Sequence, residues 1–579
     1  MTAPRTAPAP EVSPRTSSTP PVAVTPGSRL RRPGTAWVAA GLALLVTGTI
    51  VVRSLRLVPN SDSVAQQAIV QTWLRAGHDV AYLPPDTWVL KLPVYVLFEA
   101  LPVPPAVRLV LEAVTLVGGG YALLALALRS LIRRSRPLGV LARRTDVALP
   151  IAWLATVAGE FGTFQAVMPN YRNVELGLCF VLLAGCAAFL AGPRPGGARP
   201  SGTRPGAGTV VGAVVGVGTA SALWVDDPYF AYLVGVPLLG GCLLWTAVTG
   251  WATGRDGHGA WRRPLLLAAL VGASLALVPG VRTVLRLAGV RVVQDATAPT
   301  FDPHVLVAHL SVLWPGLSMH LGVPRSFGPQ VWRASAPLAV AGVATLAVLA
   351  AGAVASAFVA VRAWRARTPV LALVAVLWVV VVAGVVANVT VSDQAAGRYL
   401  VLGVVDLLVV LGLATAALRR RRPRLARALT SLLAAAVLAN VTALAATRAW
   451  APPADRGRQD GTVAALRSTG AAKGFAEFWD ANLYTQATGG DVVLSDVECV
   501  GGRLRLRHWL TDTAAVRMPS PGGTVVLWNA ASDKAGGCTP VQIAAQLGRP
   551  DRLLPAPAGG VILAYRADVT ARLDPAPRG

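Results

Sequence analysis

Residues 35–63 read TAWVAAGLALLVTGTIVVRSLRLVPNSDS, and this stretch decides the fold class. Its first part, residues 35–52, is an apolar run of about 18 residues, the length that a helix needs to cross the hydrocarbon core of a bilayer. A secretory signal peptide would end in small residues at a cleavage site, and the RSLRLVPN that follows has none. We therefore expect an uncleaved first membrane helix, followed closely by a lone carboxylate, Asp62.

Similar apolar runs recur along most of the chain. Of its 579 residues, 54% are hydrophobic and only 14% are charged, which excludes a soluble protein of this length. The runs predict an α-helical polytopic membrane protein with about 11 transmembrane helices. The expected spans are about 35–52, 105–132, 147–166, 174–192, 207–224, 229–250, 264–281, 336–362, 368–390, 399–418 and 425–447. Residues 88–101 form a shorter apolar stretch, and its prolines predict an interfacial or re-entrant segment.

The net charge of +25 is distributed as a topology signal rather than as a nucleic-acid surface. Arginines gather in short loops between the apolar runs, as the positive-inside rule requires of cytoplasmic loops. They lie near residues 129–144, 194–204, 255–263, 362–367 and 419–427. With the N-terminus inside and alternating spans, all of these clusters fall on the cytoplasmic side. We expect no nucleic-acid partner.

The two ends of the chain differ from its apolar middle. Residues 1–34 are rich in Pro, Thr, Ala and Ser and predict a disordered cytoplasmic tail, and residues 35–449 form the multi-pass region. Residues 450–579 are polar, with short β-rich runs such as DVVLS, TVVLW and GVILAY after an expected helix, GFAEFWDANLYTQATGG. They predict a small C-terminal extracytoplasmic α+β domain, with the C-terminus outside.

Two of the five cysteines, Cys499 and Cys538, lie in this C-terminal domain. A disulfide persists on the oxidising, outer side of a membrane, so we expect these two residues to bond. The other three lie in expected membrane helices and are interpreted as packing residues.

Polar residues also gather at the expected outer ends of the spans. An enzyme that activates a hydroxyl needs a carboxylate base, and a site for a lipid-linked phosphate needs arginine side chains beside it. A simpler interpretation remains open for each residue: Ser63 and Gln66 have the spacing of a capping box, Asp226–Asp227–Pro228 suits a turn, Arg172 suits a headgroup contact, and Asp393 with Arg398 suits a loop ion pair. The candidate substrate-binding residues are Glu160, Asn170, Tyr171, Arg172, Glu175, Arg291, Asp393 and Arg398, and the candidate catalytic residues are Asp62, Asp226 and Asp227.

With these motifs, PNSDS, MPNYRN and WVDDPYF, the chain resembles the GT-C-type glycosyltransferases, including protein mannosyltransferase-like enzymes from actinobacteria. The resemblance covers roughly residues 35–450 and is one of architecture. It implies transfer of a sugar from a polyprenyl-phosphate donor to a cell-envelope glycan or protein acceptor at the outer face of the plasma membrane. Asp62 would be the base, Asp226 or Asp227 a second carboxylate that orients the sugar or supports a divalent metal, and Arg172, Arg291 and Arg398 would bind the donor phosphate.

Two other classes of function stay open from the sequence. A multi-pass transporter or flippase would favour internal repeats and charges near the bilayer midplane. Asp406, inside the predicted span at 399–418, is the candidate for such a charge. A non-catalytic protein of envelope assembly would keep the same architecture without chemistry. The scattered histidines show no metal-ligand spacing. Whether the protein needs a metal cofactor stays open from the sequence.

Overall fold

The protein is represented by a computed structural model. The residues that it describes are 34–56, 61–83, 88–134, 143–157, 172–191, 207–252, 262–293, 300–324, 329–365, 401–447, 455–529 and 537–575, with isolated positions between 382 and 390.

The protein is mostly helical, and seven helical segments of the described part are long and apolar enough to cross a membrane. They lie in helices α1 (Gly34–Arg56), α4 (Pro105–Arg134), α7 (Asn173–Ala191), α11 (Arg262–Ala276) with α12 (Val278–Leu287), α14 (Pro329–Arg365), α16 (Val401–Arg421) and α17 (Pro423–Ala446). Each coincides with a predicted span, which supports the assignment of the chain as a multi-pass membrane protein.

The other four predicted spans are shown in part or not at all. Those at 207–224 and 229–250 are the helices α8 (Ala207–Asp226) and α10 (Val236–Ala252), with the short α9 (Pro228–Phe230) and a π-helical turn (Ala231–Gly235) between them. The span at 147–166 begins as α5 (Thr145–Thr156), and most of the one at 368–390 lies outside the described residues.

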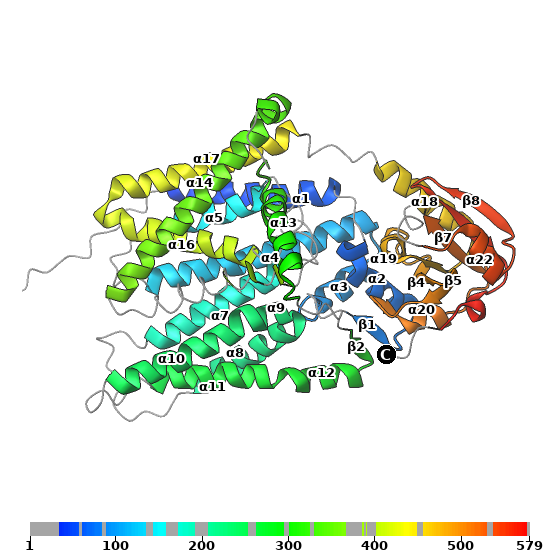
Figure 1. Cartoon of the computed structure of the whole chain (residues 1–579), viewed down its shortest axis with the longest axis horizontal. Coiled ribbons are helices and arrows are strands. Elements are labelled where there is room, and N and C mark those ends of the chain that lie inside the picture. Colours follow the sequence, from blue (N-terminus) through cyan, green and yellow to red (C-terminus); the bar gives the residue numbers. More distant parts are fainter. Residues whose placement is uncertain are drawn as a thin grey trace, which may run out of the picture.

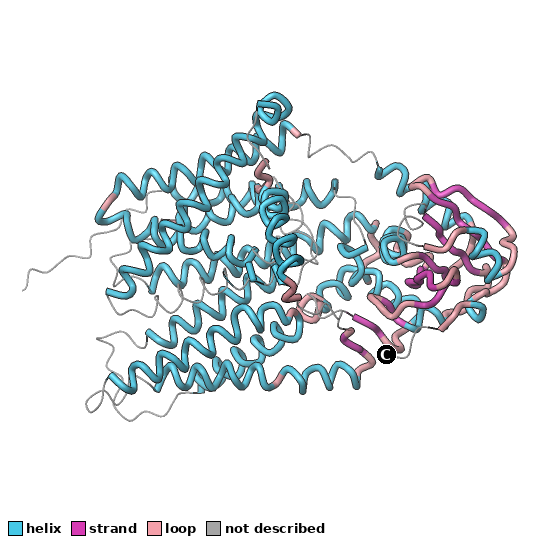
Figure 2. Tube along the Cα trace, viewed as in Figure 1, coloured by secondary structure: helices cyan, strands magenta, loops and turns pink. Residues whose placement is uncertain are grey.

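Helix α16 lies at the centre of the bundle. Its apolar window is 89% buried, whereas the windows of the other six spans are between 28% and 50% buried. Long helices run side by side around it in Figure 2, and the largest apolar core of the protein joins α1, α4, α5, α7, α16 and α17. The bundle thus surrounds one apolar helix and leaves its outer faces to lipid.

A set of short elements covers one end of the bundle. They are α2 (Ser61–Ala76), β1 (Ala81–Leu83), α3 (Leu92–Glu99), β2 (Val290–Val292) and α13 (Pro303–Leu321). Helix α3 is too short to cross a bilayer, as expected for the interfacial segment. The segment 282–335, between two predicted spans, contains the end of α12, the strand β2 and the whole of α13. Helix α13 runs across the direction of the spans in Figure 1.

The C-terminal region is built on a six-stranded mixed sheet of order β5-β4-β3-β7-β9-β8. Its central pairs, β3 with β4 and β3 with β7, are parallel, and the outer pairs are antiparallel. Separate apolar cores fill its two faces. The elements are α18 (Asp455–Ser468), β3 (Lys473–Ala476), α19 (Phe478–Ala487), β4 (Val493–Val500), β5 (Arg503–Leu506), β6 (Thr511–Asp512), α20 (Thr513–Arg517), β7 (Thr524–Asn529), α22 (Pro540–Leu547), β8 (Arg552–Ala556), β9 (Gly560–Tyr565) and a 3₁₀ turn (Thr570–Arg572).

One expected helix is partly wrong. The stretch GFAEFWDANLYTQATGG begins with strand β3, and only Phe478–Ala487 are helical. Gly474 lies at the centre of the sheet, where a Cβ atom would come 2.4 Å from the carbonyl oxygen of Val525. Burial between two neighbouring strands overrides the helical pattern of the local sequence.

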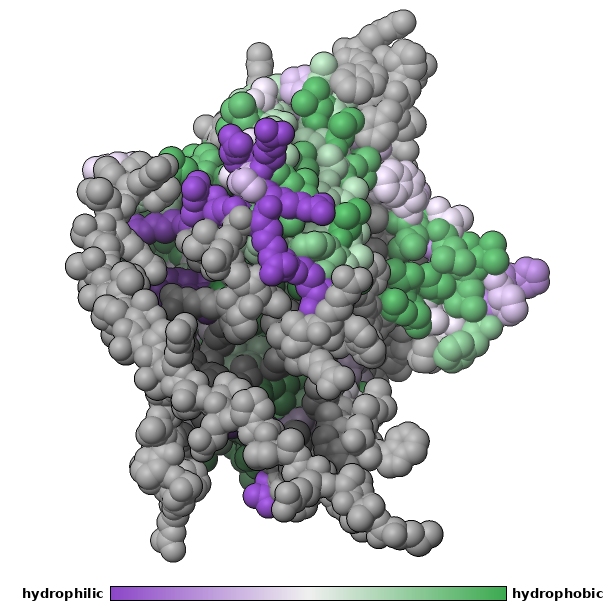
Figure 3. Space-filling model, turned by 90° about the vertical axis from the view of Figure 1, so that its left-hand side faces the viewer, coloured by the Kyte–Doolittle hydropathy of each residue, from purple (hydrophilic) through white to green (hydrophobic). Residues whose placement is uncertain are grey.

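The junction of α16 and α17 and the C-terminal region lie at opposite ends of the bundle (Figure 1). The junction of α16 and α17 carries exposed arginines at 421, 422 and 424. Figure 3 looks onto this end and shows hydrophilic side chains gathered there among hydrophobic ones. The exposed arginines of this one junction therefore lie at the end of the bundle away from the C-terminal region.

Candidate functional site

Four of the predicted site residues come together at the end of the bundle nearest the C-terminal region. Arg172 forms an ion pair with Asp227, although 55 residues separate them. Glu175, in the first turn of α7, pairs with the ammonium of Lys91 at 3.0 Å, and both side chains are fully buried. Asp226 ends α8, accepts a hydrogen bond from the backbone N–H of Leu90 at 3.2 Å, and lies in hydrogen-bond contact with Glu175. We call the five residues Lys91, Arg172, Glu175, Asp226 and Asp227 the inner charged cluster.

Close packing of α4 and α7 positions this cluster. A Cβ atom on Gly120 would lie 2.4 Å from the carbonyl oxygen of Asn173, and one on Gly177 would lie 2.5 Å from the carbonyl oxygen of Gly120. Only glycine permits backbones to approach this closely in a membrane bundle. The first turn of α7, with Glu175, is thereby held against α4.

A second group of buried polar residues lies next to the inner charged cluster. Gln67 donates to Glu112 at 2.8 Å, and Gln71 donates to Glu99 at 2.7 Å. Arg108 forms an ion pair with Glu99 at 2.8 Å. The two carboxyl groups are also in hydrogen-bond contact with each other. We call Gln67, Gln71, Glu99, Arg108 and Glu112 the carboxyl-pair group.

The two groups share one charge pattern, in which two buried carboxyl groups contact each other beside one cation. Glu99 and Glu112 have Arg108, and Glu175 and Asp226 have Lys91. Two adjacent carboxylates repel each other, and the cation beside each pair compensates part of that charge. Tyr95 of α3, fully buried, lies within electrostatic reach of Glu112, Glu175 and Asp226 and connects the two groups.

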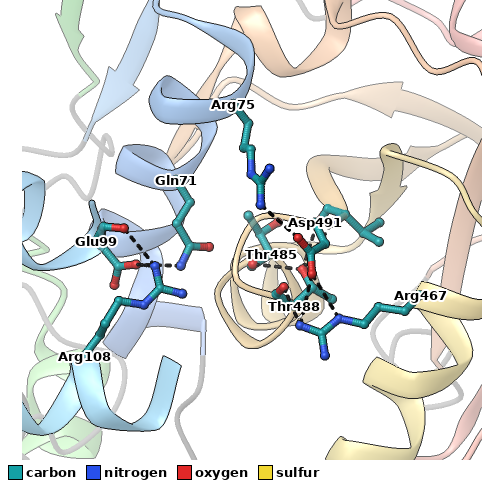
Figure 4. Close-up of polar contacts among 9 residues, drawn as sticks. Gln71, Arg75, Glu99, Arg108, Arg467, Thr485, Thr488 and Asp491 are labelled. Carbon is teal, nitrogen blue, oxygen red and sulfur yellow. Dashed lines mark hydrogen bonds and ion pairs between the residues drawn. The ribbon is translucent and has the colours of Figure 1, made fainter. Parts of the chain in front are cut away.

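The C-terminal region packs directly on the carboxyl-pair group (Figure 4). A Cβ atom on Gly489 would lie 3.1 Å from Nη2 of Arg108, and one on Gly490 would lie 3.3 Å from Cβ of Gln71. Both glycines have positive φ, +69° and +78°, so the turn after α19 follows a path that other residues rarely adopt. Asp491 then joins Arg75 of α2 at 2.9 Å to Arg467 of α18 at 3.2 Å.

A three-stranded sheet of order β2-β1-β6 ties distant parts of the chain together at the same end. His78, just before β1, contacts the Asp512 carboxylate at 2.7 Å and the carbonyl oxygen of Ala288 at 2.9 Å. Burial alone would lower the pKa of His78, but these two hydrogen bonds and the charges of Asp512 and Asp79 raise it overall. The first segment after α1 and the C-terminal region are thus one packed unit around α2.

Several predicted residues are placed elsewhere or are not described. Arg291 lies exposed on β2, apart from the inner charged cluster. Asp62 is the second residue of α2, and its side chain is outside the described part. Helix α2 begins at Ser61, two residues before the Ser63 of the expected capping box. Glu160, Asn170, Tyr171, Asp393 and Arg398 lie outside the described residues.

The disulfide prediction is confirmed, and the interpretation of Arg172 as a headgroup contact is wrong. Cys499 and Cys538 are bonded, with Cα atoms 5.2 Å apart. The Arg172 side chain is only 11% exposed, because its guanidinium turns inward to Asp227. Within the described ranges, three or more His, Cys, Asp or Glu side chains do not gather as a metal site would require.

Sequence reasoning missed Lys91, Tyr95, Glu99, Arg108 and Glu112. The signal that could have found them is their presence in apolar surroundings, since a charged residue in a membrane bundle is costly unless it is paired or functional. Gln67 and Gln71 also have the i, i+4 spacing of one helix face.

No model of a known protein family matches the chain, and no curated protein matches it either. The functional argument therefore depends on the geometry of these residues.

Proposed function

We propose that the protein is a membrane glycosyltransferase that moves a sugar from a polyprenyl-phosphate donor to a cell-envelope acceptor. Its membrane would be the plasma membrane, with about 11 spans, the N-terminus inside and the C-terminal region outside. The observation that carries the proposal is the convergence of Arg172, Glu175, Asp226 and Asp227 with Lys91 at one end of the bundle. All except Lys91 were predicted from the sequence for this chemistry, and they lie at the start of α7 and at the end of α8.

The sidedness has two further supports. The arginine-bearing junction of α16 and α17 lies at the end of the bundle opposite to the C-terminal region, as a cytoplasmic loop would (Figure 1). The Cys499–Cys538 disulfide suits an oxidising compartment. Both support an outer position for the inner charged cluster, where the head of a lipid-linked sugar would be presented.

In the proposed reaction, the Asp62 carboxylate takes the proton of an acceptor hydroxyl. The hydroxyl oxygen then bonds to the anomeric carbon of the sugar as the bond from that carbon to the phosphate oxygen breaks, and polyprenyl phosphate leaves. Arg172 would stabilise the charge of the leaving phosphate. Asp226 and Asp227 are buried, so their role would be to orient Lys91 and Arg172 rather than to contact the sugar.

The test is transfer of radiolabelled sugars from a panel of polyprenyl phosphates to acceptor material, in membranes with matched amounts of protein. Wild type is compared with Asp62→Asn and with Asp460→Asn, which changes an exposed aspartate of α18. Transfer that Asp62→Asn abolishes and Asp460→Asn preserves supports the proposal. Equal transfer by wild type and both variants would show that Asp62 is not the base.

Proton-coupled transport is a second candidate, because buried carboxyl groups in a bundle are also the elements of proton relays. The two carboxyl pairs meet through Tyr95, and both oxygens of Asp406, on the central helix, have no hydrogen-bond partner among the described residues. Failure of every donor in the transfer assay, together with proton uptake by proteoliposomes that Asp406→Asn abolishes, would favour this function over transfer.

A further inference from the structure

The segment Arg507–His508–Trp509, between β5 and β6, gathers aromatic rings and arginines from three parts of the chain. The His508 ring stacks on the ring of Tyr82, with centroids 4.0 Å apart and planes 13° from parallel. The guanidinium of Arg291, the residue paired with Tyr82 in the sheet, lies 5.7 Å from the same tyrosine ring. These contacts of Tyr82, Arg291 and His508 therefore join β1 and β2 to the C-terminal region.

The other half is built around Arg507. Its guanidinium lies 5.6 Å from the Phe478 ring and 5.9 Å from the Trp509 ring. Phe478 in turn makes an edge contact with Trp479, whose residue surface is 52% exposed. We call the seven residues Tyr82, Arg291, Phe478, Trp479, Arg507, His508 and Trp509 the arginine–aromatic ledge.

The ledge is positively charged at neutral pH. Arg291 is exposed and has no carboxylate within ion-pair distance among the residues that the structure describes. Burial, together with the charge of Arg291, lowers the pKa of His508, so the imidazole is neutral at pH 7. The two arginines thus supply the charge of the surface.

The carboxylate of Asp496 compensates the positive charge of Arg507 only weakly. Asp496 of β4 is 2% exposed, its Oδ2 lies 3.9 Å from Nη1 of Arg507, and neither oxygen has a hydrogen-bond partner in the described part. Burial raises the pKa of Asp496. The positive charge of Arg507 lowers this pKa, and the negative charges of Glu477 and Glu498 raise it further. A buried polar group without a partner is costly, which is typical of a site that awaits a ligand.

We propose that the arginine–aromatic ledge binds an acidic sugar chain. A guanidinium stacked on an aromatic ring keeps its edge N–H groups for a bidentate contact with a carboxylate. The apolar faces of sugar rings suit the exposed ring of Trp479, whereas a lipid phosphate would need the arginines alone. The identity of this chain as the acceptor depends on the proposed transferase function, but its binding does not.

The experiment measures binding of fluorescent oligogalacturonate to the full-length protein in nanodiscs. Dextran of matched length is the neutral control, and dodecyl phosphate is the competitor that represents a lipid phosphate. The variants are Arg291→Ala, Arg507→Ala and Trp479→Ala, and the matched control is Arg552→Ala, an exposed arginine on the far edge strand β8.

We expect oligogalacturonate to bind and dextran to bind at least about 10-fold more weakly, since the arginine contacts are charge-assisted. Each ledge variant should weaken oligogalacturonate binding about 10-fold, and Arg552→Ala should not change it. Equal binding of the two polymers, equal loss in Arg552→Ala, no binding of either polymer, or selective binding of dodecyl phosphate would each overturn the proposal. Binding of oligogalacturonate without sugar transfer would leave this inference intact and refute the transferase function alone.

Discussion

The two ends of the helix bundle carry opposite kinds of charge. At one end, arginines are exposed around the buried ion pair of Asp146 with Arg419. At the other end, the buried charges are mostly acidic: Glu99, Glu112, Glu175, Asp226 and Asp227 share Lys91, Arg108 and Arg172. Exposed arginines cost little and orient the protein in a membrane, whereas buried carboxyl groups cost stability and are kept for a function.

The largest effect should come from removing the buried cation of the acidic end. Lys91→Met leaves Glu175 and Asp226 without a positive partner and is expected to destabilise the protein by about 3–5 kcal/mol. Thermal unfolding in detergent checks this. Arg419→Met is the matched change at the other end, and it should cost less, because Asp146 also accepts a hydrogen bond from the backbone N–H of Arg143 at 2.8 Å. An equal cost of both changes would contradict the comparison.

A pH effect should distinguish the C-terminal region from the bundle. Burial raises the pKa of Asp480 to about 6; a hydrogen bond from Asn529 opposes this, and Glu477 adds to it. The folded state then holds this proton more tightly than the unfolded state does, so stability should fall by up to about 3 kcal/mol as pH rises from 4 to 6. Asp480→Asn should flatten this part of the pH profile, measured by hydrogen exchange of the strands around α19. An unchanged slope in the variant would show that Asp480 is ionised normally.

A smaller effect tests whether the carboxyl pairs share protons. Glu112→Gln replaces one member of a pair by a neutral group of the same shape, so the cost should be below about 1.5 kcal/mol if the pair already holds a proton. Glu112→Lys is the contrasting change and should prevent folding. A loss in Glu112→Gln as large as that in Lys91→Met would mean that Glu112 is ionised.

The smallest effect belongs to the arginine end. Arg424→Gln changes an exposed side chain at the start of α17 and should alter the free energy of unfolding by no more than about 0.5 kcal/mol. Because the positive-inside rule depends on the sum of such charges, the same experiment should examine replacement of all arginines between 420 and 427, which leaves the Asp146–Arg419 pair intact. Stable but inverted insertion of that variant, seen by accessibility of the C-terminal region, would confirm that these charges act on orientation.

The helical segments were largely predictable, and their partners were not. A run such as residues 402–419 predicts a span from its own hydropathy, because transfer to lipid is a sum over the residues of one segment. Glu112 and Lys91 could not be predicted as site residues, because their contacts are with Gln67 and Glu175, which only the folded chain brings near. The prediction of a helix at Gly474 was wrong for the same reason, because this residue belongs to strand β3 through its neighbours in the sheet.

By itself, the sequence determined the class of protein and the disulfide between Cys499 and Cys538. These follow from hydropathy, charge and composition, which are local properties of a segment. Only the tertiary structure decided that Arg172 meets Asp227, that two carboxyl pairs lie beside single cations, and that the turn at Gly489–Gly490 packs on Arg108. The reason is that electrostatic pairing falls off over a few ångströms, and those distances are set by how glycines let helices approach.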